Sequence, residues 1–550
     1  MSSKNTRQTE RRDLLALTGA SALSALLLTL AFPPAELSFL AWFALAPMLV
    51  ALRVRWGKLG LLTLCLTGMA YGALGFSWAR HVTWLGMFLL GLYLSVYWIV
   101  FAALTRWLSF RRGLPLALVA PVTWTALECI RGVALTGLPW LFLSHTQYRA
   151  LPVIQIADVT GAAGVTFWLV ACNGLVADVI CLLRGWEPGS RRRRTLAAGL
   201  GVLALCAASL GYGLYRLETI VVEEGPPVAA TQGNIPQSVK KVVTEDTFRD
   251  MFHTYLGLTI QALAAPEPPH LILWPETMAR PYMFDSRNNW DRLNNRPRMN
   301  RWVLALSKHQ RNADLLISAN SGPDPETRPD YNSVFLLPRG GKGTARPDGR
   351  TTARYDKIHL VPFGEYVPLK KLIGWIVGPM VPYQFGMAPG SEHVLYEVSN
   401  APGWHYAPTI CFEDAFPSLV ADFGRGDRHM DFIVNLTNEG WFLDGTELDQ
   451  HLAIAVFRAV ECRAGFIRSA NTGISAFVSP TGEIVSTLVV DGKDRQVKGV
   501  LHGVAMRTQS TSPYLVVGEL FGTLCVVGLF CMILPGWPGI RKWGRGRRTD

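Results

Sequence analysis

The sequence predicts a multi-span α-helical membrane domain joined to a layered α/β domain. Of its 550 residues, 49% are hydrophobic and only 17% are charged, which is too apolar for a soluble protein of this size. Apolar runs long enough for a bilayer, which requires about 20 helical residues, gather at the two ends of the chain. The intervening residues 217–512 hold most of the acidic residues and only short apolar runs. These contrasts indicate two kinds of domain.

Eight apolar runs have approximately the length of a membrane span, and seven of them lie in the first half: 14–32, 36–52, 59–79, 84–104, 114–131, 161–183, 195–215 and 513–535. Each contains few charged residues, as the bilayer interior requires. We therefore expect a membrane domain over 1–216 with about seven transmembrane helices. A catalytic domain should follow over 217–512, and residues 513–550 should form an eighth helix with a basic tail.

Lys and Arg residues beside the spans predict the orientation, because such residues are retained on the cytoplasmic side. They gather in alternate connecting segments, including Arg53, Arg55, Lys58 and the run 191–194. An N-terminus inside the cell then puts residues 217–512 outside the cytoplasm. The same distribution explains the net charge of +12. We therefore expect no nucleic-acid partner, since a binding surface for one would interleave basic and aromatic side chains.

Strands and helices should alternate within residues 217–512. Short apolar runs predict strands at 227–231, 271–274, 314–319, 332–337, 405–410, 431–436 and 474–479. Apolar positions at helical spacing predict helices at 244–264, 299–311 and 445–464. This alternation is typical of a layered α/β domain.

Reactive side chains lie beside three expected strand ends. Glu276 follows the run 271–274, Lys357 precedes the segment 358–365, and Cys411 follows an apolar strand. Each has an ordinary alternative role, as a turn-capping Glu, a solvated Lys or a core Cys. Together they suit nucleophilic catalysis, because a thiol with a pKa of about 8.5 needs a base or a nearby cation to react at neutral pH.

The expected division of roles follows from the chemistry of each group. Glu276 can take the thiol proton and return it to the leaving group. Lys357 can keep that carboxylate ionised and bind the oxyanion of a tetrahedral intermediate. The backbone N–H of Phe412, next to the nucleophile, is a second expected oxyanion donor. The set predicts acyl transfer through Cys411.

These residues resemble the Glu-Lys-Cys triad of the nitrilase, or carbon-nitrogen hydrolase, superfamily, which stands on an α-β-β-α sandwich. Nearly the whole chain is similar to the membrane-bound apolipoprotein N-acyltransferases of that superfamily. The motifs are Gln-Gly-Asn-Ile-Pro-Gln at 232–237, Trp-Pro-Glu at 274–276, Lys-Ile-His-Leu-Val-Pro-Phe-Gly-Glu at 357–365 and Asn-Thr-Gly-Ile-Ser at 471–475. The resemblance implies that Glu276 is the base, Lys357 the triad lysine and Cys411 the nucleophile. It implies that Glu365 and Glu413 are supporting acids.

Two positions depart from the family pattern. Tyr commonly follows the nucleophile and Trp the Gln-Ser-x-Lys run, whereas this chain has Phe412 and Lys241. The missing hydroxyl and indole could change how the acyl chain or the acceptor is held. Neither change removes a member of the expected triad.

The resemblance implies a bacterial inner-membrane enzyme with its catalytic domain on the periplasmic side. Its donor would be a phospholipid, and its acceptor the α-amine of a diacylglyceryl-cysteine lipoprotein, with Cys411 carrying the acyl group as a thioester. Ester, thioester and amide chemistry needs no cofactor, and we expect none. A membrane-tethered amidase that uses water as acceptor is the alternative. A transporter is less consistent, because its spans should carry inward-facing charges or interrupted helices.

Residues after Glu365 form an apolar run with Gly and Pro that predicts a membrane arm, in which Trp375 and Ile376 contact lipid. A buried excursion of the core is the alternative for this run. Cys462 lies on an apolar helix face and should be a core residue. The spacing of His and Cys residues fits no metal site, so we expect no metal. We expect the chain to act as a monomer with its membrane lipids.

Overall fold

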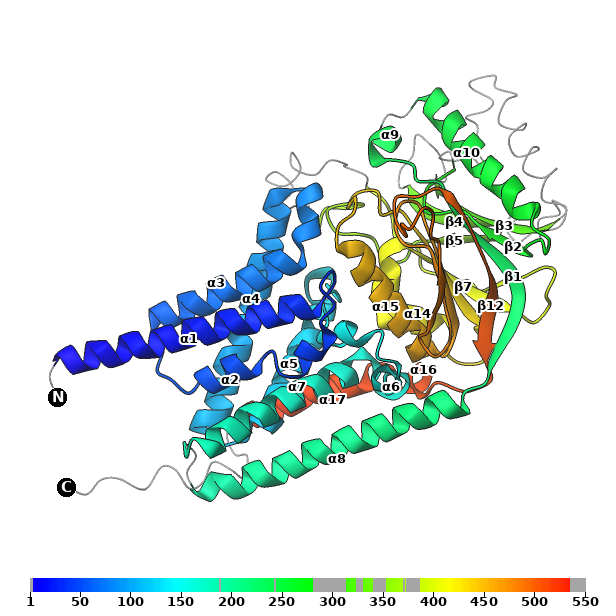
Figure 1. The fold of residues 1–550 in the computed structure, drawn as a ribbon. Helices are drawn as coiled ribbons and strands as arrows, with labels where there is room; N and C mark the ends of the chain where they lie inside the picture. Colours follow the sequence, from blue (N-terminus) through cyan, green and yellow to red (C-terminus); the bar gives the residue numbers. More distant parts are fainter. Residues whose placement is uncertain are drawn as a thin grey trace. The chain divides into compact units, whose positions relative to one another are not determined.

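The computed structural model describes residues 3–186, 189–241, 244–279, 313–322, 330–339, 353–368, 371 and 386–534. The chain divides into two compact units, each of which is described by itself. One unit comprises residues 1–219, 445–453 and 517–550, and the other comprises residues 220–444 and 454–516. The first unit is mainly helical, and the second contains the β-sheets (Figure 1).

Within the described residues, six helices of the first unit are long and apolar enough to cross a membrane. They are α1 (Ser3–Ala31), α3 (Lys58–Gly75), α4 (Trp84–Arg106), α5 (Leu116–Val133), α7 (Ala157–Leu183) and α8 (Gly189–Thr219). Helices α3 and α4 approach closely, because a Cβ added at Gly72 would lie 2.9 Å from the Cα of Gly91. Small residues at such crossings let helix backbones meet, which is how membrane helices commonly pack.

Two of the expected spans are shorter or interrupted. The run 36–52 forms a 3₁₀ helix, η1 (Ser38–Trp42), followed by α2 (Ala46–Ala51). The last expected span is divided into α16 (Pro513–Val517) and α17 (Leu520–Ile533), with Gly518 between them at φ +55°. A left-handed residue ends a right-handed helix, which explains the interruption. Hydropathy alone could not reveal it.

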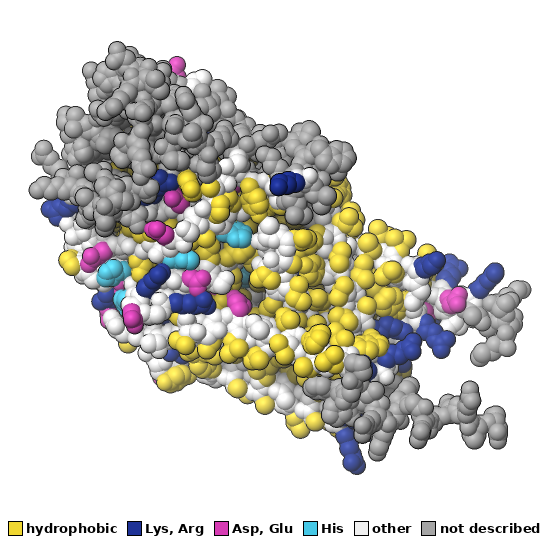
Figure 2. Space-filling view, turned by 180° about the vertical axis from the view of Figure 1, so that it is seen from behind, with side chains coloured by type: hydrophobic (Ala, Val, Ile, Leu, Met, Phe, Trp, Pro, Cys, Tyr) yellow, Lys and Arg dark blue, Asp and Glu magenta, His cyan; other side chains and the backbone are white. Residues whose placement is uncertain are grey.

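The surface of the helical unit has the character of a membrane protein. Leu59, Leu66, Leu89 and Val96, on α3 and α4, are more than half exposed. Figure 2 shows a broad hydrophobic surface over the helices, with Lys and Arg side chains gathered at one end of it. Exposed apolar side chains on this scale require lipid or another apolar partner. The unit is therefore that of a multi-pass membrane protein.

Buried polar groups join the ends of these helices. The fully buried Asp178 accepts hydrogen bonds from the backbone N–H groups of Leu116 (3.1 Å) and Ala117 (2.9 Å) at the start of α5, and it lies 3.8 Å from Arg191. The first N–H groups of a helix have no partner within the helix and favour a nearby negative charge. Asp178 therefore caps α5 from α7.

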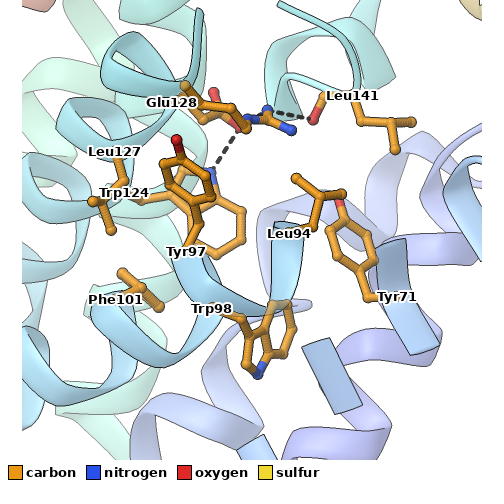
Figure 3. A pocket seen from close by; sticks show the side chains of 10 residues that line it. Tyr71, Leu94, Tyr97, Trp98, Phe101, Trp124, Leu127, Glu128 and Leu141 are labelled. Carbon is orange, nitrogen blue, oxygen red and sulfur yellow. Dashed lines mark hydrogen bonds and ion pairs between the residues drawn. The ribbon is translucent and has the colours of Figure 1, made fainter. Parts of the chain in front are cut away.

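Glu128 fixes the chain that follows α5. Its carboxylate accepts from the Leu143 N–H (3.0 Å), Trp124 Nε1 (2.9 Å) and Thr166 Oγ1 (2.9 Å), and it lies 3.9 Å from Arg131 Nη2. Such a charge is stable in a membrane unit only when it is paired in this way. The pair borders a cavity of about 40 Å³ (Figure 3), which is lined by Tyr71, Leu94, Tyr97, Trp98, Phe101, Trp124, Leu127, Glu128, Arg131 and Leu141.

The second unit contains, among its described residues, two six-stranded sheets. The first sheet has the order β12-β1-β2-β3-β4-β5, and the second β11-β10-β9-β8-β7-β6. The first is built from β1 (Val222–Gln232), β2 (Leu271–Leu273), β3 (Asp314–Ser321), β4 (Tyr331–Leu337), β5 (Ala353–Asp356) and β12 (Gly499–Thr508). The second is built from β6 (Tyr396–Glu397), β7 (His405–Ile410), β8 (Phe432–Thr437), β9 (Gly465–Ala470), β10 (Ala476–Val478) and β11 (Ile484–Thr487).

The central strands of both sheets are parallel and largely buried. Strand β1 pairs with β2, and β2 with β3, in parallel, as do β7, β8 and β9 in the other sheet. Parallel strands require layers on both faces, which accounts for their nearly continuous apolar sequence. The two sheets pack face to face, and Ser469 Oγ of β9 donates to the carbonyl of Thr231 in β1 (3.0 Å).

A helix covers the outer face of the first sheet. Helix α10 (Glu245–Leu263) packs on β1, β2 and β3 (Figure 1) through a core that includes Phe252, Tyr255, Trp274 and Leu315. Its N-terminus is capped by the Thr244 side chain, which accepts from the Thr247 N–H. Helices α14 (Pro417–Phe423) and α15 (Glu447–Cys462) follow strands of the second sheet.

The predicted fold class, a multi-span helical membrane domain with an α/β sandwich, is confirmed. All seven expected strands have a counterpart, as do the helices expected at 244–264 and 445–464. The helix expected at 299–311 lies outside the described residues. Glu276 and Cys411 follow the carboxyl ends of the parallel strands β2 and β7.

Candidate functional site

Glu276 lies just beyond β2, at the carboxyl end of a buried parallel strand. The residue is 8% exposed and forms a turn with Thr277. The Oε1 atom accepts from Asn332 Nδ2 (2.7 Å), and Oε2 accepts from the backbone N–H of Asn438 (3.2 Å). Asn332 belongs to the same sheet, whereas Asn438 follows β8 of the other sheet. The carboxylate is therefore held from both sheets.

Lys357 follows β5 directly, and its backbone N–H donates to the carbonyl of Asn332 (2.8 Å). Its side chain is 1% exposed, and Nζ lies 3.3 Å from Glu276 Oε1 and 3.0 Å from Glu365 Oε1. Burial acts to lower the pKa of Lys357, but the charges of Glu365 and Glu276 raise it above its ordinary value. The amine is therefore protonated and paired at neutral pH.

Cys411 lies at the end of β7, in a backbone conformation with φ +50°. Non-glycine residues rarely adopt this region, and such strain is common at functional sites. Asn435 Nδ2, on the neighbouring β8, donates to the carbonyl of Cys411 (3.0 Å). Cys411 also contributes to the raised pKa of Lys357, which puts its thiol within electrostatic reach of that ammonium.

Glu413 joins the Lys357 segment to the Cys411 segment. Its fully buried carboxylate accepts from the N–H groups of Ile358 (2.6 Å) and His359 (3.1 Å), which follow Lys357, and of Ile410 (2.7 Å), which precedes Cys411. The Tyr355 hydroxyl donates to the same carboxylate (2.8 Å). Burial raises the pKa of Glu413 to about 7, although Lys357 and these hydrogen bonds act to lower it.

The structure thus brings together Glu276, Lys357 and Glu365 by direct contact, and Glu413 links them to the Cys411 strand end. The ring of Phe412 packs edge-on against Phe416, with centroids 5.1 Å apart. Trp375 and Ile376, the residues of the expected arm, lie outside the described residues, and the side chain of Lys241 is not described either.

The remaining thiol of this unit differs from Cys411. Cys462 is 3% exposed, and burial raises its pKa to about 12. No disulfide joins Cys411 to Cys462. A high pKa leaves Cys462 as a thiol at neutral pH, which suits a core position.

The sequence analysis assigned no role to three residues of the site: Asn332, Asn438 and Lys240, the lysine of the Gln-Ser-x-Lys run. Asn332 Nδ2 donates to both Glu276 and Glu365, the latter at 3.0 Å. Lys240 Nζ donates to Thr277 Oγ1 at 2.7 Å, directly after Glu276. Asn332 and Asn438 stand within or just after apolar strands, and a polar residue in that position is the signal that could have found them.

Two known protein families match parts of this chain. Residues 24–175 match the model of the apolipoprotein N-acyltransferase N-terminal domain, and residues 224–494 match that of the carbon-nitrogen hydrolases. The chain is 33% identical to the apolipoprotein N-acyltransferase of Geobacter metallireducens over 536 residues, which cover 94% of each protein. It is 30% identical to that of Azotobacter vinelandii over 556 residues, covering 96% of this chain and 95% of the relative.

Solved structures similar to the chain include Nit3 of Saccharomyces cerevisiae, a member of branch 10 of the nitrilase superfamily. It is 16% identical with a TM-score of 0.35, covering 52% of this chain and 90% of Nit3. The curated relatives match over nearly their whole length, through both units. The chain therefore belongs to the apolipoprotein N-acyltransferase family, and it is a multi-pass membrane acyltransferase of the nitrilase superfamily that acts in lipoprotein biosynthesis.

Proposed function

We propose that the chain transfers a fatty acyl group from a phospholipid, through a thioester on Cys411, to the N-terminal α-amine of a diacylglyceryl-cysteine lipoprotein. The observation that carries the proposal is the buried contact of Lys357 with Glu276, in a segment that Glu413 links to the strained Cys411 strand end. A base, a cation and a thiol are the groups that cysteine-based acyl transfer needs.

In the first half-reaction Glu276 takes the Cys411 proton, and the sulfur attacks the ester carbonyl. Lys357 and the Phe412 N–H stabilise the oxyanion. The C–O bond then breaks, and Glu276 returns the proton to the leaving lysophospholipid oxygen. The hydrogen bonds from Asn332 and Asn438 support this role, because they fix the Glu276 carboxylate in one orientation.

In the second half-reaction the acceptor amine attacks the thioester carbonyl. Glu276 takes a proton from the attacking nitrogen as the C–N bond forms, and the C–S bond breaks. The proton then passes to the Cys411 sulfur and restores the thiol. Lys357 stabilises the oxyanion again. Glu365 and Glu413 act as supporting acids, because one pairs with Lys357 and the other fixes the backbone on both sides of the site.

The same proposal includes the bacterial inner membrane as the location, with the α/β unit on the periplasmic side. The distribution of Lys and Arg residues supports this orientation. Membrane spans confine the enzyme to the layer that holds both a phospholipid and a lipidated protein. Confinement raises their effective concentration at the site without any added cofactor.

An amidase that uses water would need the same triad, so product analysis separates the two functions. The purified protein is mixed with phospholipid bearing a labelled acyl chain and with a diacylated lipopeptide. Acyl transfer predicts labelled, triacylated lipopeptide, whereas hydrolysis predicts labelled free fatty acid. Cys411→Ala should abolish the product, and Cys462→Ala, a matched change of a free cysteine in the same unit, should retain it. Fatty acid as the main product would reject the proposal.

A further inference from the structure

Thr277, the residue after Glu276, has a strained backbone that must be held in place. Its φ is +54°, a region that a β-branched residue adopts only under constraint. The Thr277 N–H donates to Ser318 Oγ (3.0 Å), and Thr277 Oγ1 accepts from Lys240 Nζ (2.7 Å). Lys240 Nζ also approaches the carbonyl oxygen of Glu276 (3.4 Å). A single ammonium thus contacts both residues of this turn.

Lys240 belongs to a segment that is anchored on its N-terminal side. It lies in the short helix α9 (Gln237–Lys241). Gln237 Oε1 accepts from Asn438 Nδ2 (3.2 Å), and Asn438 in turn donates its backbone N–H to Glu276. Asn471 accepts from the Ile235 N–H at 2.9 Å and fixes the start of the segment. Lys240 is therefore aimed at the Glu276 turn by contacts that do not involve its own side chain.

The charge of Lys240 acts on the reacting groups. Burial lowers the pKa of Lys240 to about 8, while Glu276 after β2 and Cys411 after β7 raise it. Among the described residues, these two are the titratable groups that act on it. A half-buried lysine that interacts with both the expected base and the expected nucleophile is unlike the solvated lysines of an ordinary surface.

We propose that Lys240 is a second functional lysine, a positioning residue that holds the Glu276 turn and favours the Cys411 thiolate by its charge. This inference deepens the proposed function and rests on it. The two contacts from Lys240 Nζ to this turn fix the orientation of the Glu276 side chain relative to the backbone. The ammonium also stabilises the negative charge after it has moved from the Glu276 carboxylate to the Cys411 sulfur in the proton transfer.

The test compares Lys240→Met, Lys240→Arg and, as a matched control, Lys498→Met at an exposed lysine of the same unit. Two readouts are followed: kcat and KM for acyl transfer to a diacylated lipopeptide, and the rate at which iodoacetamide alkylates Cys411, measured by mass spectrometry of its peptide. The alkylation rate depends on the fraction of Cys411 present as thiolate, whether or not acyl transfer is the physiological reaction. The two proposals can therefore fail separately.

We expect Lys240→Met to lower kcat by about tenfold to a hundredfold with little change in KM, and to slow alkylation at pH 7. Lys240→Arg should recover most of both. Because Lys240 loses its charge near pH 8, wild-type kcat should decline above that pH, and the Arg variant should decline at higher pH. Equal kcat and alkylation in Lys240→Met and Lys498→Met would overturn the proposal.

A second variant separates this role from general stability. Thr277→Gly relieves the strained φ and removes the hydroxyl partner of Lys240, but it leaves the lysine in place. Its melting temperature should be no lower than that of the wild type. Its kcat should still fall in part, because Lys240 no longer has the Thr277 hydroxyl as a hydrogen-bond partner in the Glu276 turn. Wild-type kcat in Thr277→Gly together with failed rescue by Lys240→Arg would also reject the positioning role.

Discussion

Replacing Lys357 with Met removes the cation shared by two buried carboxylates. Lys357 is 1% exposed, and its Nζ lies 3.3 Å from Glu276 and 3.0 Å from Glu365, whose side chains are 10% and 14% exposed. Removing one partner of a buried ion pair costs about 3–5 kcal/mol, because the charge left behind has no compensation. For a domain of this size, the melting temperature should then fall on the order of 5–10 °C.

The assay is thermal unfolding in detergent, followed by tryptophan fluorescence, since Trp274 is fully buried beside the site. Adding Glu365→Gln to Lys357→Met removes one uncompensated charge and should restore part of the loss. A double-mutant cycle should give a coupling energy of at least about 1.5 kcal/mol between the two positions. Lys493→Met, at an exposed lysine, is the control. Additive effects, or a Lys357→Met melting temperature equal to the control's, would refute the reasoning.

Other consequences follow from the same geometry. The pKa of Glu413 is raised from an ordinary value of about 4.5 to about 7 in the folded protein. The stabilisation that Glu413 contributes is therefore complete below pH 4.5, and it is lost as the pH rises through about 7. The melting temperature of the wild type minus that of Glu413→Gln should therefore shrink between pH 5 and pH 8, and a widening gap would contradict the shift. Asn332→Ala should lower kcat about tenfold or more with a small change in KM, because Glu276 and Glu365 lose a shared donor; an unchanged kcat would exclude this role. Arg468→Met should destabilise the α/β unit by about 3–5 kcal/mol, measured by the same melting assay, because the fully buried guanidinium pairs with Asp414 at 3.4 Å; an unchanged melting temperature would count against it.

Much of the fold could be predicted because its physical signals are local. A long apolar run such as 84–104 must lie in lipid or in a core, where only a helix pairs all of its backbone N–H and C=O groups within the run. Helix α4 accordingly occupies Trp84–Arg106. Buried parallel strands such as β8 read as short continuous apolar runs. The strand ends beyond β2, β5 and β7 then carry Glu276, Lys357 and Cys411, whose residue types indicated the chemistry.

The remaining features depend on contacts between distant residues. Strand β12 lies at the edge beside β1 and mixes exposed with buried positions, so its sequence shows no clear apolar run. The capping of α5 by Asp178 and the position of Lys240 beside Thr277 join segments that no local pattern connects. Such contacts are set by tertiary packing, which sequence periodicity does not report.

The most direct test of the account is the mass of the Cys411 peptide after the protein meets a phospholipid. The account predicts one added acyl mass on that peptide, which disappears when a diacylated lipopeptide amine is added. It also predicts that Glu276→Gln acquires the acyl group far more slowly. An acyl group on a different residue, or continued transfer by Cys411→Ala, would contradict the central claim that Cys411 carries the acyl group.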